Sequence, residues 1–116
     1  MIKQYNVCTH CWHKEMHCKC PIKRLRPIDH NMIYILNRLN NKGYKTRFCC
    51  GGHTEKKFIY IYIQFMDQYS FALLPDHFVY KNFILCYKNK KLKTKKEMQS
   101  DINKKIKILK KWADIL

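Results

Sequence analysis

The chain has 116 residues, of which 47% are hydrophobic, and this suffices for one domain with a modest core. It has no apolar run of about 18 residues or more and no secretory signal pattern, so we expect no transmembrane helix and a cytoplasmic location. The formal charge of +16 favours nucleic acid, a nucleoprotein complex or an anionic membrane surface as partner. The alternative is that the lysines only keep a small protein soluble.

Residues 1–26 are rich in cysteine and histidine, and we interpret them as a zinc-knuckle appendage. Cys8 and Cys11 stand in a C-x₂-C knuckle, and Cys18 and Cys20 follow as a C-x-C pair. Clustered cysteines in a reducing compartment typically bind metal, and four thiolates complete the tetrahedral shell of a structural Zn²⁺. The alternatives are four thiols without metal, or a histidine in place of one cysteine. The histidines that could compete are His10, His13 and His17.

The next part, residues 27–88, is expected to form the α+β core of the protein. It opens with a predicted helix, which Pro27 precedes, Asp29 caps and Gly43 ends in a left-handed conformation. Apolar residues recur at helical spacing within this segment, so one face of the helix should be buried.

Strands should follow that helix and form a small, mainly antiparallel sheet. Segments 44–50 and 57–65 alternate in side-chain polarity and predict two strands that could pair as a hairpin. Segment 69–74 is expected to add a third strand. Segment 78–87 is compatible with either a strand or a helix.

Between the first two predicted strands lies the sequence Cys49-Cys50-Gly51-Gly52-His53. In a regular strand adjacent cysteines face opposite sides, so one should pack in the core while the other shares an exposed rim with His53. Four interpretations stay open: a Cys50 nucleophile with His53 as its base, a second metal site completed by a ligand such as Cys86 or His77, an anion-binding turn, or a turn of purely structural role. We assign no catalytic residue and do not expect the pair to turn over a substrate.

Residues 89–116 form a basic segment and a C-terminal amphipathic helix that should pack on the core. Thr94 and Glu97 match a capping box at the start of this helix. One face carries an apolar stripe, formed by Met98, Ile102, Ile106, Leu109, Ala113 and Leu116. Lysines expected to contact nucleic acid or another partner are Lys88, Lys90, Lys91, Lys93, Lys104, Lys107 and Lys111.

The stretch LNRLNNKGYKTRFCCGGHTEKKFIYIYIQF, followed by YSFALLPDHF, resembles a group of small Cys-rich proteins of Firmicutes and their phages. Its matching residues are Gly43, Tyr44, Thr46, Cys50, Gly52, His53, Tyr62, Ile63 and Phe65. The likeness covers about residues 5–80 and implies a mobile-element origin in a bacterial host, without specifying an activity. The turn at residues 49–53 is weakly similar to the SCSGR turn of wybutosine-synthesis tRNA methyltransferases, with Gly51 for that serine and His53 for that arginine.

Together these patterns favour a small zinc-binding, non-enzymatic protein that engages nucleic acid or a host nucleoprotein complex. The resemblance extends this expectation to inhibition of a host defence such as a CRISPR effector. Lysine far outnumbers arginine, which favours contacts with the phosphate backbone over base reading. The alternatives are an enzyme that uses Cys50 and His53, and a protein-interaction module that uses the C-terminal helix. Candidates for stacking on bases are Tyr5, Trp12, Tyr34, Tyr44 and Tyr60.

Overall fold

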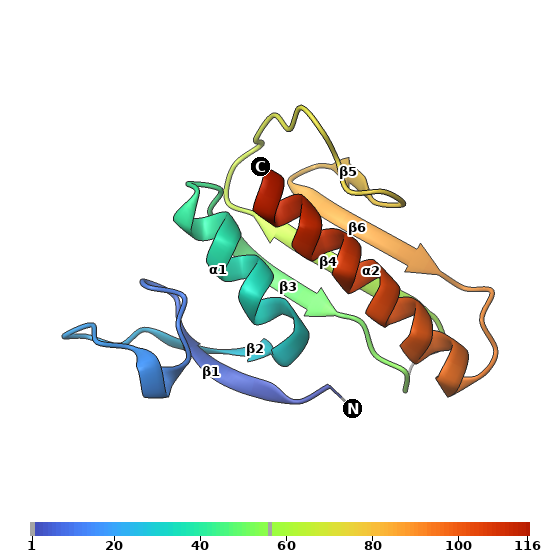
Figure 1. The fold of residues 1–116 in the computed structure, drawn as a ribbon, viewed down its shortest axis with the longest axis horizontal. Coiled ribbons are helices and arrows are strands. Elements are labelled where there is room, and N and C mark those ends of the chain that lie inside the picture. The colour runs from blue at the N-terminus through green and yellow to red at the C-terminus, as the bar shows by residue number, and fades with distance from the viewer. Residues whose placement is uncertain (1, 56) are drawn as a thin grey trace.

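The computed structural model describes residues 2–55 and 57–116, and within them the chain forms two α-helices and two antiparallel sheets (Figure 1). This confirms the predicted α+β class. The smaller sheet pairs β1 (Gln4–Cys8) with β2 (Leu25–Asp29). The larger sheet has the order β3-β4-β6-β5, with strands β3 (Thr46–Gly51), β4 (Ile59–Phe65), β5 (Val79–Lys81) and β6 (Ile84–Asn89). The helices are α1 (Ile33–Asn41) and α2 (Lys95–Ile115), and short 3₁₀ turns span Glu15–His17 and His30–Met32.

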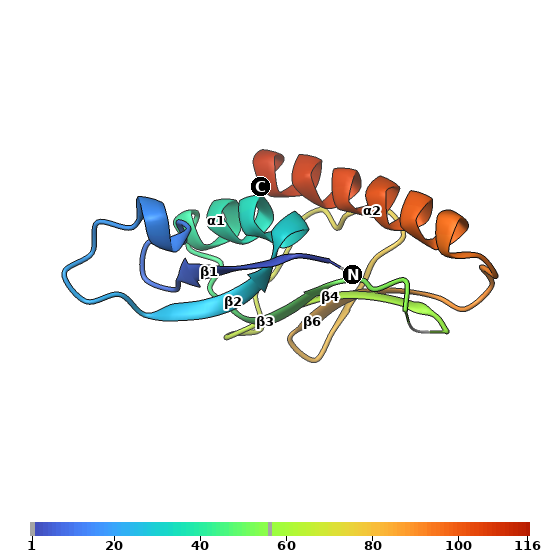
Figure 2. The same ribbon diagram turned by 90° about the horizontal axis from the view of Figure 1, so that it is seen from below.

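Both helices lie on one face of the larger sheet and leave its other face open (Figure 2). The residues of strand β4 alternate strictly between buried and half-buried positions, as expected for a sheet that is covered on one face only. Ile59, Ile61, Ile63 and Phe65 point toward the helices and are at most 2% exposed. The residues between them point to the other side, which we call the open face. Burying four large apolar side chains of one strand contributes about 1.5–3 kcal/mol for each.

Helix α2 packs on the larger sheet and covers the core. The predicted stripe is buried from Met98 to Ala113, and Trp112 joins it. The Thr94 side chain accepts a hydrogen bond from the Glu97 amide at 3.1 Å, which confirms the predicted cap. Because the stripe packs on the chain's own sheet, it is not available as a docking surface for a partner. The alternative of a protein-interaction module based on this stripe therefore loses its physical basis.

The start of the first helix differs from the prediction. Residues 25–29 form strand β2, so the expected boundary between the zinc-knuckle appendage and the α+β core, after residue 26, falls inside a strand. Helix α1 begins only at Ile33. Asp29 precedes a 3₁₀ turn and makes no capping hydrogen bond with its side chain. The cap assignment was wrong because partners distant in sequence engage this carboxylate. The left-handed stop is confirmed, since Gly43 has a φ of 94°.

The predicted hairpin of β3 and β4 is confirmed, with Cys50 opposite Tyr62. The predicted strand at 69–74 is wrong. Its aromatic side chains instead fill a cluster with their neighbours, in which the Phe71 ring lies 5.2 Å from the rings of both Tyr44 and Trp112. The Leu73 carbonyl accepts a hydrogen bond from Trp112 Nε1 at 2.7 Å, so this backbone is satisfied without a sheet.

Segment 78–87, left open between strand and helix, contains two strands. Strands β5 and β6 pair across a two-residue turn at Asn82 and Phe83. Both residues have positive φ, 52° and 67°, and this matches the type I′ turn that the right-handed twist of a hairpin favours. Apolar periodicity alone could not reveal this turn because phenylalanine rarely adopts a positive φ.

Candidate functional site

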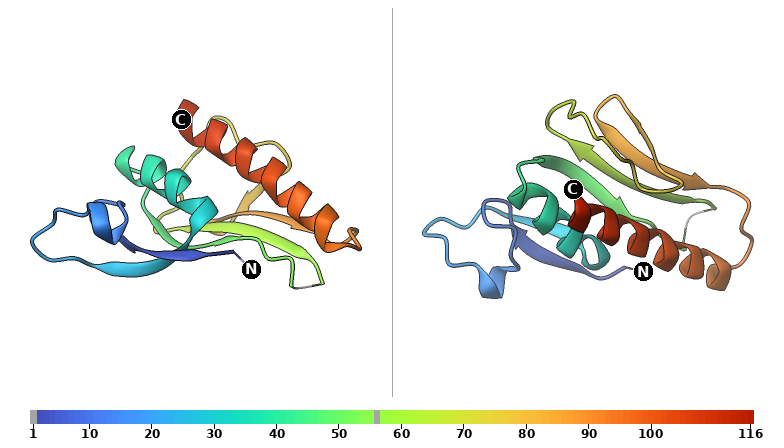
Figure 3. Two further views of the ribbon diagram at one scale, coloured as in Figure 1. Left: turned by 60° about the horizontal axis from the view of Figure 1, so that its bottom comes forward. Right: turned by 45° about the horizontal axis from the view of Figure 1, so that its top comes forward.

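The N-terminal hairpin carries the four predicted metal ligands at the end that projects beyond the larger sheet (Figure 3). Cys8 ends β1, Cys11 lies in the following turn, and Cys18 and Cys20 follow the first 3₁₀ turn. Their sulfur atoms all lie within 4.8 Å of one another, and Cys8 Sγ is 4.0 Å from Cys20 Sγ. The four cysteines could therefore hold one metal ion.

Local backbone geometry builds this cluster. The turn after Cys8 is closed by a 2.7 Å hydrogen bond from the Trp12 amide to the Cys8 carbonyl, with Trp12 at a φ of 61°. The Cys20 amide points at Cys18 Sγ at 3.4 Å, the kind of contact that orients a sulfur ligand. The cluster includes none of the three predicted competitors, His10, His13 and His17, which are exposed.

The cysteines of the cluster differ in acidity. Hydrogen bonds from backbone amides, chiefly that of Arg24, lower the pKa of Cys8 to about 6. Burial and the neighbouring thiols raise the pKa of Cys20 to about 12. Without a metal the four sulfurs would therefore hold protons between them, and metal binding would release these protons. Four sulfur ligands in one compact group suit Zn²⁺ among the common divalent ions.

A second group forms where β2 lies beside β3, and it joins the predicted pair Cys50 and His53 to Asp29. One ligand atom from each of the three residues lies within 4.8 Å of the other two. Asp29 is only 4% exposed, and its Oδ2 atom lies 3.9 Å from His53 Nε2. Neither Cys86 nor His77, the partners that sequence reasoning offered for a second metal, belongs to the group.

The two adjacent cysteines face opposite sides of β3, as predicted. Cys49 pairs with Ile63 and packs against the core, and burial raises its pKa to about 12. Cys50 pairs with Tyr62 on the open face. Cys49 is therefore a partly buried residue on the core side of the strand, whereas Cys50 faces the same side as the aromatic residues of β4.

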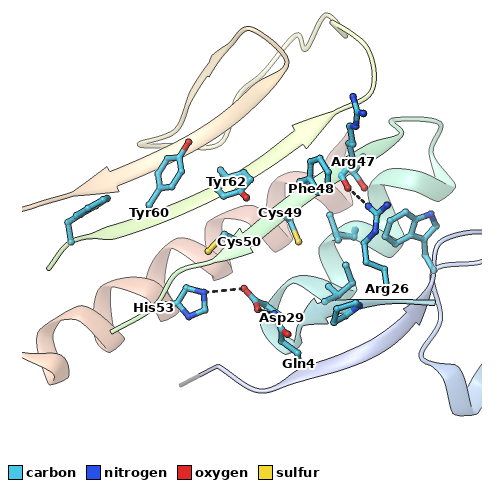
Figure 4. A pocket seen from close by; sticks show the side chains of 16 residues that line it. Gln4, Arg26, Asp29, Arg47, Phe48, Cys49, Cys50, His53, Tyr60 and Tyr62 are labelled. Carbon is cyan, nitrogen blue, oxygen red and sulfur yellow. Dashed lines mark hydrogen bonds and ion pairs between the residues drawn. The ribbon is translucent and has the colours of Figure 1, made fainter. Parts of the chain in front are cut away.

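A cavity of about 280 Å³ opens at the seam between β2 and β3 and extends over the open face (Figure 4). Its lining includes Asp29, Cys50 and His53. Its aromatic and basic lining consists of Arg26, Arg47, Phe48, Phe58, Tyr60 and Tyr62, with Trp12 at one end. Of these residues, only Tyr60 and Trp12 were predicted from the sequence as candidates for stacking on bases. The period-2 alternation of segment 57–65 was the signal that could have placed Tyr62 and Phe58 beside Tyr60.

Cations lie over the rings of the open face. The guanidinium carbons of Arg26 and Arg47 are 5.4 Å and 5.7 Å from the centre of the Phe48 ring. Lys88 Nζ lies 4.9 Å from the Tyr60 ring, and Lys90 Nζ lies 5.8 Å from the Phe58 ring. Both distances are within the range of cation–π attraction.

The seven lysines that were predicted to contact nucleic acid or another partner lie on different surfaces of the protein. Lys88 and Lys90 accompany the open face, whereas Lys104, Lys107 and Lys111 are exposed on α2, which covers the opposite face of the sheet. Lys91 and Lys93 are exposed in the loop between β6 and α2. Among the other stacking candidates, Trp12 is 7% exposed and Tyr44 is part of the aromatic cluster.

No helix in the described part of the chain is both long enough and apolar enough to cross a membrane. Comparison of the chain with protein-family models, with curated proteins and with solved structures finds no match. We therefore infer function from the geometry of this chain.

Proposed function

We propose that this protein is a zinc-stabilised, non-enzymatic protein that binds single-stranded nucleic acid, free or within a nucleoprotein complex, through the open face of its larger sheet. The observation that carries the proposal is the combination of accessible rings and cations on that face. Phe48 is 50% exposed and Phe58 is 36% exposed, and each has a basic side chain over its ring. Unpaired bases stack on such rings, while the cations meet the phosphates.

Charge supports the same surface. None of the four strands of the larger sheet contains an aspartate or glutamate, so no fixed acidic group of these strands would repel a phosphate backbone. Tyr60 and Tyr62 extend the aromatic surface, with their ring centres 5.0 Å apart. Their phenol groups, whose pKa burial raises, stay neutral and add no negative charge at neutral pH.

The metal has a structural role in this proposal. Four protein ligands leave no coordination position for a substrate, and this is typical of structural zinc. The hairpin that the metal closes also supplies Arg26, whose guanidinium donates a hydrogen bond to the Arg47 carbonyl. Zinc would thus hold one edge of the binding surface in place.

We further propose a phage or mobile-element origin and action on a nucleoprotein complex of the bacterial host, such as a CRISPR effector. The support is the resemblance of residues 5–80 to phage-encoded Cys-rich proteins, together with the charge of +16. Purification of the tagged chain from host cells, with and without nuclease treatment, tests this part. Recovery of nucleic acid alone would contradict a nucleoprotein target. Recovery of a host effector in stoichiometric amount after nuclease treatment would support it.

The binding surface is tested by fluorescence anisotropy with a labelled oligothymidine and a labelled oligouridine. Tyr60→Ala removes a stacking ring and should weaken binding by about 1–3 kcal/mol. Tyr60→Phe keeps the ring and is the matched control, so its affinity should equal that of the parent. Equal affinity of all three proteins would contradict the open face as the binding surface.

A Cys50 enzyme is less well supported by the same geometry. A general base must have one imidazole nitrogen directed at the nucleophile. In this structure His53 Nε2 is 3.9 Å from Asp29 and His53 Nδ1 is 3.9 Å from Glu55, so a carboxylate lies near each nitrogen. Loss of a measurable catalytic activity in a folded Cys50→Ser protein would reverse this conclusion.

A further inference from the structure

We propose that Asp29, Cys50 and His53 form a second metal site, with three protein ligands for a Zn²⁺ ion and an open fourth position toward the cavity. This site would be independent of nucleic-acid binding and of metal at the four-cysteine cluster. The donor set, one carboxylate oxygen, one sulfur and one imidazole nitrogen, is a combination that zinc accepts. In contrast to the four-cysteine cluster, it leaves one position for water.

The spacing of the donors fits a metal ion after a modest closure. Tetrahedral zinc with bonds of about 2.0–2.3 Å places its ligand atoms about 3.3–3.8 Å apart. Asp29 Oδ2 and His53 Nε2 are already 3.9 Å apart, and no pair in the group exceeds 4.8 Å. Rotation of the Cys50 and His53 side chains, which line the cavity (Figure 4), could supply this closure.

Groups outside the donor set already hold the ligands in position. The Gly51 amide donates a 2.8 Å hydrogen bond to Asp29 Oδ2, and Gln4 Nε2 donates one of 3.0 Å to Asp29 Oδ1. Carboxylate ligands of metals are typically oriented by such hydrogen bonds, and a ligating histidine typically directs its other nitrogen at a carboxylate. Glu55 is placed for this second role, with Oε2 at 3.9 Å from His53 Nδ1.

The burial of Asp29 gives a reason for a cation at this point. The two hydrogen bonds from Gly51 and Gln4 offset part of the cost of burying this carboxylate, which is 4% exposed, and a positive charge would offset more of it. Its ion-pair partner within the described residues is His53, which offers a positive charge only when protonated. A divalent ion would compensate the carboxylate while His53 is neutral, and neutral imidazole is the form that binds metal.

The test measures zinc per chain by mass spectrometry after equilibration of the full-length protein with excess Zn²⁺ and removal of unbound ion. Cys50→Ala should bind about one equivalent less than the parent. Cys49→Ala, which removes the neighbouring thiol from the core side of the strand, should bind as much as the parent. Cys11→Ser reports the four-cysteine cluster separately. Equal zinc content in the parent and Cys50→Ala would overturn the proposal.

A second variant and a second readout guard against a folding defect. If circular dichroism shows that Cys50→Ala is unfolded, His53→Gln replaces it, because His53 is on a half-exposed turn. Glu55→Gln changes a positioning residue and should weaken zinc affinity about 10-fold or more without changing the stoichiometry. In Co²⁺-loaded protein, the proposed site should contribute a sulfur-to-metal absorption band that Cys50→Ala lacks. An identical Co²⁺ spectrum in the parent and this variant would also overturn the proposal.

Discussion

The Gly51 amide donates a hydrogen bond to the carboxylate of Asp29, 22 residues earlier in the chain, and this contact joins the two sheets. It requires a very close approach of β3 to the turn after β2. A Cβ atom at Gly51 would lie 1.9 Å from Asn31 Oδ1, and Asn31 Nδ2 in turn donates a 3.1 Å hydrogen bond to the Gly51 carbonyl. Position 51 must therefore be a glycine, because β3 and the 3₁₀ turn that contains Asn31 pack too closely for a side chain.

Gly51→Ala should therefore destabilise the protein by about 1–3 kcal/mol, because the added methyl group must displace Asn31 and weaken the contact with Asp29. Urea denaturation followed by circular dichroism measures this loss. Gly43→Ala is the matched control, since no atom lies within 4 Å of the corresponding Cβ position. It should be affected only through its φ of 94°, by about 1 kcal/mol. A Gly51→Ala protein as stable as the parent would contradict the close approach.

Purified protein should contain about one tightly bound zinc ion at the four-cysteine cluster, and Cys11→Ser should remove it. Elemental analysis of protein prepared without chelator checks the content. Chelation should lower the melting temperature, because the N-terminal hairpin loses the ion that closes it. Acidification should release the metal as well, since protons compete with zinc for the thiolates. Equal metal contents in the parent protein and in Cys11→Ser would contradict this assignment.

Binding of a labelled single strand should fall steeply with salt, because each neutralised phosphate releases counterions. Changing Lys88 and Lys90, which lie over the rings of the open face, together to Gln should lower the salt slope by about 0.7 for each phosphate that these two lysines neutralise in the parent. Changing Lys104, Lys107 and Lys111 together to Gln should leave the slope close to that of the parent, because α2 covers the opposite face of the sheet, and the fold should survive since all three side chains are exposed. Tyr60→Ala should weaken binding without changing the slope, because the tyrosine side chain carries no charge. If the triple variant binds as the parent does, the α2 lysines take no part in binding.

Asp101 ties α2 to β6 and gives a prediction about pH. Its Oδ1 accepts a 2.8 Å hydrogen bond from Lys105, and its Oδ2 accepts one from the Tyr87 hydroxyl. Burial would raise the pKa of Asp101, but these hydrogen bonds, chiefly that of Lys105, outweigh burial and hold the pKa below its ordinary value of 3.8. A lowered pKa stabilises the fold above pH 3.8, and this contribution is lost as the pH falls through the lower, folded-state pKa.

Asp101→Asn should consequently cost about 1–3 kcal/mol at neutral pH, because it leaves the largely buried Lys105 ammonium without its anionic partner. The difference between variant and parent should shrink in acid, and denaturant titrations at several pH values measure it. The control is Asp114→Asn, which breaks an exposed pair with Arg38 and should have a much smaller effect. A pH-independent difference would contradict the role of the Asp101 charge.

The elements with a local signature were predictable from sequence. The four cysteines of the cluster could be named because a knuckle and a C-x-C pair bring sulfurs together through short turns. The cap at Thr94, the stop at Gly43 and the alternation of β4 likewise depend on neighbours within a few residues. In these cases the spacing along the chain already determines which side chains can meet.

The features that depend on distant contacts could be read only from the folded chain. Asp29 has the local pattern of a helix cap, yet its carboxylate binds Gly51 and lies beside Cys50 and His53 because β2 lies alongside β3. Segment 69–74 has the composition of a strand, but its rings pack against Trp112 from the far end of the chain. The face on which Tyr60 became accessible was settled when both helices packed on the opposite side of the sheet, where they bury more apolar surface.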